Sequence, residues 1–278
     1  MAKQAVVRPC DLTASEAAAR FRTGELTPTA LMESLLEQAR RLEPSLKAWA
    51  WLDEERALDA ARHAEVEMAR GGPRSPLHGI PVGVKDIYYT AGVPTQMGSP
   101  LYAGYVPHYD ATSVARLRRA GAVIMGKTVT TEFASLQPPQ TRNPWNAEHT
   151  PGGSSSGSAV AVASRMCPLA LGSQTGGSVI RPAAFNGVVG LKPTHGLISA
   201  FGVFPVAWSL DTMGVMARSV EDVALALQEL AGYDAYDGES VDTPVPDYRQ
   251  SMRSLEHAPR IGLLRQFFFE RSLPETRQ

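Results

Sequence analysis

The sequence predicts an α/β protein with a mixed central sheet, helices on both faces of the sheet, and a helical segment at the N-terminus. Two patterns carry this prediction. Helical periodicity fills the first 75 residues, and short apolar runs alternate with helical segments after them. A net charge of -1 and 44% hydrophobic residues in 278 are typical of a globular chain. We expect an N-terminal segment, residues 1–75, packed on a core, residues 76–278, as one domain overall.

Three helices are predicted in the N-terminal segment. Thr13 and Glu16 are spaced as a capping box before the first helix. Thr27 followed by Pro28 is typical of an N-cap and first-turn proline, and leucines then recur on one face to about Leu42. The third helix is predicted over residues 53–70, where Gly71 follows.

The core is predicted to alternate strands and helices. Strands are expected at residues 79–84, 122–125, 169–171, 188–189 and 260–264, and helices at 110–121, within 152–164, and at 220–231. Three adjacent phenylalanines, residues 267–269, stand close to the last residue and are hard to bury without further chain. We therefore expect the chain to be truncated at its C-terminus, with an incomplete core, or to need a partner.

Composition excludes several classes of protein. The near-zero net charge argues against a nucleic-acid binder, which needs a basic face. Two cysteines, Cys10 and Cys167, cannot form a disulfide framework, which indicates a reducing compartment. No signal peptide and no run of about 20 apolar residues is present, so we expect a cytoplasmic protein without a membrane span. Histidines and cysteines do not cluster, so neither a metal nor a cofactor is expected.

Residues 121–128 match the phosphate-loop pattern G-x-x-x-x-G-K-[ST]. The pattern needs small, flexible residues that fold around an anion after a strand. Here the intervening positions include β-branched Val123 and Ile124, which favour a strand. We interpret this stretch as a core strand that ends at a turn.

Residues 153–157 match the nucleophile-elbow pattern G-x-S-x-G. That pattern follows an apolar strand, whereas residues 146–152 are rich in proline and glycine. No feature of the sequence links a histidine to a buried acid. A Ser-His-Asp hydrolase is therefore disfavoured.

A third set of residues is spread over three segments, namely 152–158, 172–178 and the strand that ends at Lys85. Each segment alone is typical of a turn or of a surface lysine. Together they supply the parts of an acyl-transfer site. Ser178 follows two glycines, so successive N–H groups can converge as an oxyanion hole. A serine nucleophile needs a base. No histidine lies in these loops, and burial would lower the pKa of Lys85.

These segments resemble the amidase signature family, the serine amidases with a Ser-Ser-Lys triad. The resemblance covers residues 77–230 and is carried by blocks that occur in the family's order: GIPVGVKD at 79–86, GKT at 126–128, PGGSS at 151–155, GSQTGGS at 172–178 and GVVGLKPT at 187–194. It departs from the commoner pattern at several positions, among them Gln174, where aspartate is frequent, and Arg181, which lies three residues after Ser178 rather than two.

The resemblance implies a role for each matching residue. Ser178 would be the nucleophile, Lys85 the neutral base, and Ser154 the bridging serine, which follows a cis peptide bond in the family. The oxyanion hole would be formed by the backbone N–H groups of Thr175, Gly176, Gly177 and Ser178.

The function implied is that of an amidohydrolase, which cleaves a carboxylic amide through a serine acyl-enzyme and releases ammonia or an amine. One alternative is an amidotransferase subunit that releases ammonia from glutamine for a tRNA-linked partner chain. Another is a non-catalytic fragment or binding subunit that keeps the fold. The expected partner is a small-molecule amide, with no direct contact to nucleic acid or membrane, and a homodimer or a partner subunit is left open. Phe133 and Ala134 either line the acyl side of the site or belong to the core.

Overall fold

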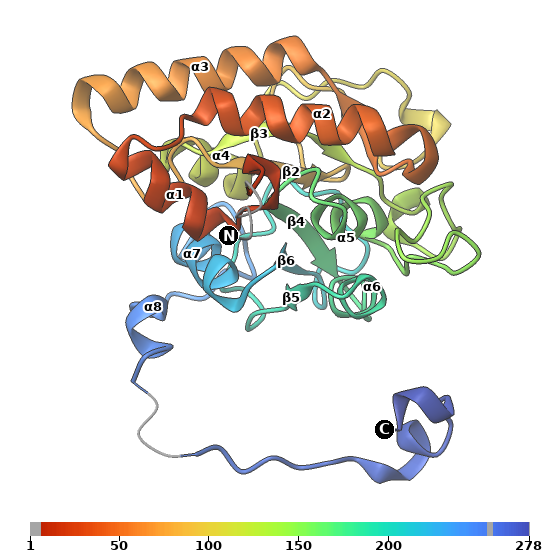
Figure 1. Ribbon diagram of the computed structural model, residues 1–278. Coiled ribbons are helices and arrows are strands. Elements are labelled where there is room, and N and C mark those ends of the chain that lie inside the picture. Colours follow the sequence, from red (N-terminus) through yellow and green to blue (C-terminus); the bar gives the residue numbers. More distant parts are fainter. Residues whose placement is uncertain (1–6, 255–257, 278) are drawn as a thin grey trace, which may run out of the picture.

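A six-stranded mixed sheet lies at the centre of the computed structural model (Figure 1), which describes residues 7–254 and 258–277. The strand order is β1-β3-β2-β4-β6-β5. Strand β2 is parallel to both β3 and β4, whereas β1, β6 and β5 pair antiparallel with their neighbours. The strands are β1 Trp49–Leu52, β2 Pro81–Lys85, β3 Val123–Thr128, β4 Leu169–Gln174, β5 Val189–Leu191 and β6 Thr212–Ala217. The predicted fold class is confirmed.

The N-terminal helices are α1 (Ala14–Thr23), α2 (Pro28–Leu46) and α3 (Glu54–Gly71). Both predicted caps are confirmed. Thr13 and Glu16 form a reciprocal capping box, and the Thr27 side chain accepts a hydrogen bond from the third residue of α2. Between α2 and α3 the chain forms β1, which pairs with β3. The expectation of helices alone was therefore wrong at these four residues, while the division at residue 75 stays a prediction.

Helices lie on both sides of the sheet. Helix α7 packs against β4, β5 and β6, and α5 and α6 lie on the other side of these strands (Figure 1). The helices after the N-terminal segment are α4 Thr112–Arg119, α5 Ser156–Ala163, α6 Ile180–Asn186, α7 Val220–Leu230 and α8 Tyr248–Ser251. Shorter helical turns are η1 Pro9–Asp11, η2 Pro100–Tyr102, η3 Glu132–Ala134, η4 Arg265–Phe269 and η5 Pro274–Thr276. Of the helices described, none has the length and apolarity to cross a bilayer.

Strand β6 was not predicted, although all six of its residues are buried. It pairs with β4 on one edge and β5 on the other, and α5 and α7 pack against it, so it has no solvent-facing side and no alternation of polar and apolar residues. Its glycine, Gly214, lies so close to β5 that an added Cβ would stand 2.4 Å from the Leu191 carbonyl oxygen. A buried middle strand with a central glycine gives little signal in sequence.

The strand predicted at residues 260–264 is wrong. These residues have no regular structure, and Ile261 and Leu264 are 91% and 79% exposed. Figure 1 shows this end of the chain running away from the sheet. A strand needs a neighbour for its backbone N–H and C=O groups, and no strand lies beside this segment in the described part of the chain.

Candidate active site

Lys85 is the last residue of β2 and is fully buried. Its position follows from the sheet, because β2 is covered on its two edges by β3 and β4. The Lys85 amine donates hydrogen bonds to the hydroxyls of Ser154, at 2.7 Å, and Ser173, at 2.8 Å. Burial lowers the pKa of Lys85 from 10.5 to about 7, and the nearby Asp211 carboxylate opposes that fall. The amine can therefore exist uncharged near neutral pH.

Ser154 lies in the loop before α5, and the peptide bond between Gly153 and Ser154 is cis, as the resemblance implied. The Ser154 carbonyl accepts a hydrogen bond from the Thr131 N–H at 3.1 Å. Helix α5 can approach the β1–β3 edge closely only because Gly157 has no side chain. An added Cβ there would lie 2.2 Å from the Ala48 carbonyl oxygen. This close packing places the loop that carries Ser154 over the end of β2.

Ser178 lies in the loop between β4 and α6, and it is 9% exposed. Its carbonyl accepts a hydrogen bond from the Ser155 N–H at 3.3 Å, so the two serine loops touch through their backbones. Within the described part of the chain, the Ser178 hydroxyl has no hydrogen-bond partner. The structure thus brings Lys85 and Ser154 into direct contact and places Ser178 beside the Ser154 loop.

The four residues expected to form the oxyanion hole follow β4 directly. Among the described hydrogen bonds, none has the backbone N–H of Thr175, Gly176, Gly177 or Ser178 as its donor. A Cβ built on Gly176 would meet nothing within 4 Å, so this part of the loop faces open space. Gln174, where the family often has aspartate, accepts hydrogen bonds at 2.9 Å from the N–H groups of Val179 and Ile180. Its neutral amide oxygen thereby fixes the start of α6.

Two residues at the site have contacts that sequence reasoning missed. Strands β2 and β4 are parallel neighbours, so their carboxyl ends meet at one edge of the sheet. The Ser173 hydroxyl therefore lies near the Lys85 amine. The sequence signal that could have identified Ser173 is its hydroxyl near the end of the strand next to β2. Arg181 donates two hydrogen bonds, from Nε at 3.1 Å and Nη2 at 2.7 Å, to the carbonyl of Gly153. It ties α6 to the residue before Ser154.

A pocket of about 420 Å³ adjoins the Ser154 loop, and Arg181 is one of the residues that line it. Phe133 and Ala134 are not among the residues that line it. The Phe133 ring packs against Tyr102 and Phe204, with ring centroids 6.1 and 5.6 Å away, and Ala134 is buried. A role for Phe133 and Ala134 in substrate binding stays a prediction. The pocket is lined by residues 131, 135–136, 138–139, 141–142, 147–153, 181 and 185.

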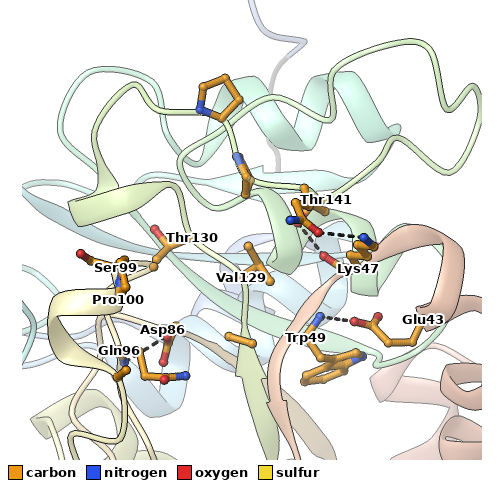
Figure 2. A pocket seen from close by; sticks show the side chains of 16 residues that line it. Glu43, Lys47, Trp49, Asp86, Gln96, Ser99, Pro100, Val129, Thr130 and Thr141 are labelled. Carbon is orange, nitrogen blue, oxygen red and sulfur yellow. Dashed lines mark hydrogen bonds between the residues drawn. The ribbon is translucent and has the colours of Figure 1, made fainter.

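A larger cavity, of about 570 Å³, lies beyond the end of β2 and is shown in Figure 2. Asp86 and Gln96 stand on one side of it, and Glu43 and Lys47 on the other (Figure 2). The side chains of the proposed triad do not line this cavity.

Residues 123–128 of the stretch that matches the phosphate-loop pattern form β3, which confirms that this part is a strand. Lys127 is buried in the fold. Its amine donates to the Tyr88 carbonyl and the Thr95 hydroxyl, each at 2.7 Å, and lies 3.4 Å from the Asp86 carboxylate. This lysine therefore links the segments around the end of β2.

Comparison with known proteins places these features in one family. A glutamyl-tRNA(Gln) amidotransferase subunit from Roseiflexus sp. (strain RS-1) is 45% identical to the chain over 273 residues, which are 95% of the chain and 55% of that protein. Peptide amidase from Stenotrophomonas maltophilia superimposes with a TM-score of 0.82 at 42% identity, covering 86% of the chain and 52% of that protein. The corresponding amidotransferase subunit from Thermotoga maritima gives a TM-score of 0.72 at 36% identity, covering 85% and 50%.

The chain spans about half the length of the curated relatives it matches. The likeness extends beyond the site, because the family model described as amidase matches residues 30–278, from the start of α2 onward. A family match over most of the chain, relatives at more than 40% identity and the shared fold agree with one another. The chain belongs to the amidase signature family.

Proposed function

We propose that the protein containing this chain is an amidohydrolase that works through an acyl-enzyme on Ser178. The observation that carries the proposal is the buried Lys85 amine, 2.7 Å from the Ser154 hydroxyl and with its pKa lowered to about 7. A lysine that is neutral near the working pH can accept a proton, whereas an exposed lysine cannot.

In the proposed mechanism, the first proton transfers run from Ser178 to Ser154 and from Ser154 to Lys85. Ser178 Oγ forms a bond to the amide carbonyl carbon, and the carbonyl oxygen takes up the negative charge. The N–H groups that follow β4 stabilise this oxyanion. The Ser154 and Ser178 hydroxyls are not hydrogen-bonded to each other among the described residues, so this relay needs them to meet when substrate is bound.

Breakdown of the tetrahedral intermediate breaks the C–N bond. The proton held by Lys85 returns through Ser154 to the leaving nitrogen, which departs as ammonia or an amine. Water then attacks the carbonyl carbon of the Ser178 ester and loses a proton to the same relay. The C–O bond to Ser178 breaks, the relay returns that proton to Ser178 Oγ, and the carboxylic acid is released. The relay is neutral again at the end of the cycle.

The direct test uses the complete gene product with a fluorophosphonate probe and a panel of small amides. We expect Ser178→Ala to lose both probe labelling and amide hydrolysis, because the nucleophile is gone. Ser45→Ala is the matched control, since Ser45 is an exposed serine on α2 whose hydroxyl binds, among the residues described, only the Leu42 carbonyl. A Ser178→Ala enzyme that still hydrolyses amides would refute the acyl-enzyme. Failure of the wild-type protein to label would favour a non-catalytic binding subunit.

A second candidate function is glutamine-dependent amidotransfer as a catalytic subunit. The observation in its favour is that relatives at 41–45% identity over almost the whole chain are named as subunits of glutamyl-tRNA(Gln) amidotransferase. In this role the same site would hydrolyse glutamine, and a partner subunit would receive the ammonia. Glutaminase activity together with co-purification of a partner chain would support it. Activity on other amides without glutaminase activity would favour the amidohydrolase.

A further inference from the structure

Asp211 joins two loops at the edge of the candidate site. It lies one residue before β6, and its two carboxylate oxygens have different partners. Oδ1 accepts a hydrogen bond from the Thr175 hydroxyl. Oδ2 accepts two, from the N–H groups of Val206, at 2.7 Å, and Ala207, at 3.0 Å. Such charge-assisted hydrogen bonds are stronger than those between neutral groups.

The sheet explains why these residues meet. Strands β4 and β6 are antiparallel neighbours, and their last paired residues on this side are Gln174 and Thr212. Thr175 and Asp211 are the next residue outward on each strand. Their side-chain contact therefore continues the ladder at the point where β4 gives way to the loop of Ser178.

The other described anchors of this loop lie at its far end, where Gln174 binds the N–H groups of Val179 and Ile180, the Ser178 carbonyl accepts from Ser155, and the Gly177 carbonyl accepts from Arg181. The two residues after Thr175 are Gly176 and Gly177, which are conformationally free, and Gly176 faces open space. Thr175 is β-branched, so fixing its hydroxyl restricts the side-chain rotamer and the orientation of its own peptide unit. An oxyanion hole contributes to catalysis only if its donors are already in place when charge develops.

We propose that Asp211 is a positioning residue that fixes the oxyanion loop through the hydroxyl of Thr175. The inference rests on the proposed function, since it needs the N–H groups after β4 to be oxyanion donors. Asp211 would then affect catalysis indirectly, because its carboxylate holds Thr175 rather than the substrate.

The test compares variants of both partners in the complete gene product. Thr175→Val replaces the hydroxyl with a methyl group of similar size, Thr175→Ser keeps the hydroxyl, and Asp211→Ala removes the acceptor. We expect Thr175→Val and Asp211→Ala to lower kcat for amide hydrolysis about tenfold to a hundredfold with little change in KM, since loss of a whole oxyanion donor costs about 10² to 10³ in kcat. Thr175→Ser should retain most of the activity.

The double variant separates positioning from independent effects. If Asp211 acts through Thr175, the Asp211→Ala/Thr175→Val enzyme should be no slower than the slower single variant. Additive losses would overturn the proposal, and so would wild-type kcat in Thr175→Val. If Asp211→Ala does not fold, the two Thr175 variants still decide, because they leave the Val206 and Ala207 contacts intact. Ser178→Ala separates a failure of this inference from a failure of the proposed function. An active Ser178→Ala enzyme would refute the proposed function. An inactive Ser178→Ala enzyme together with a fully active Thr175→Val enzyme would refute only the inference about Asp211.

Discussion

Activity should require an uncharged Lys85, and the cost of charging it sets the pH dependence. The fall in its pKa from 10.5 to about 7 corresponds to about 5 kcal/mol of extra free energy to hold the ammonium form in the site. At pH 7.5 an ordinary lysine is neutral in only about one molecule in a thousand, whereas Lys85 is mostly neutral. Burial therefore raises the concentration of usable base by almost three orders of magnitude.

The expected pH profile follows directly. Below about pH 7, kcat/KM for amide hydrolysis should rise about tenfold per pH unit, and above it the rate should level off. Lys85→Arg places a guanidinium there that stays charged at any working pH, so it should lose about 10² to 10⁴ in kcat/KM, as should Lys85→Met. The measurement is ammonia release from a simple amide between about pH 5.5 and about pH 10, a range that includes the pH at which an unburied lysine titrates.

The control is Lys47→Arg, because Lys47 is an exposed lysine whose amine, in the described part of the chain, binds only the Gln140 side chain. It should leave the whole profile unchanged. Two results would refute the reasoning: a Lys85→Arg enzyme within about tenfold of wild type, or a wild-type acid limb centred above about pH 9, where unburied lysines begin to lose their proton.

Two further predictions concern charge and packing near the site. Asp211→Asn removes a negative charge that raises the pKa of Lys85, so the acid limb of kcat/KM should move to lower pH; an unmoved limb, or one moved upward, would contradict this. Gly157→Ala should destabilise the complete gene product by about 3 kcal/mol in urea unfolding, because its Cβ meets the Ala48 carbonyl oxygen. Gly71→Ala, in open space on α3, should change stability by less than about 1 kcal/mol, and equal losses in the two variants would refute the packing argument.

Most helices and the central parallel strands could be predicted because their signals are local. The caps at Thr13 and Thr27 each bind the backbone that the sequence pattern indicated. Strands β1 and β6 were not predicted, because they are strands by virtue of their pairing with neighbours in the sheet. The opposite error at residues 260–264 has the same origin, since an apolar run becomes a strand only beside a partner.

At the site, the sequence identified the residue types and the family resemblance assigned their roles. The contact between Lys85 and Ser154 joins positions 69 residues apart, and no local pattern encodes such a distance. The contacts of three further residues could not be predicted, for a related reason. These residues are Ser173, Arg181 and Asp211. Ser173 accepts a hydrogen bond from the Lys85 amine, Arg181 donates to the Gly153 carbonyl, and Asp211 accepts from the Thr175 hydroxyl. Which of these segments meet is decided by the order of the strands.

That order also explains why the site lies where it does. The chain passes from β2 to β3 on one side and later returns to place β4 on the other side of β2. Connections that leave neighbouring parallel strands in opposite directions open a crevice at their carboxyl ends, where α/β proteins bind ligands. Lys85 ends β2 and Ser173 lies near the end of β4, so their contact occurs at this crevice. An apolar side chain would fill the position of Lys85 at lower cost in stability. A cost of about 5 kcal/mol for the charged form is large against a net stability of about 5–15 kcal/mol for a typical domain, as expected of an amine that serves the proposed chemistry rather than folding.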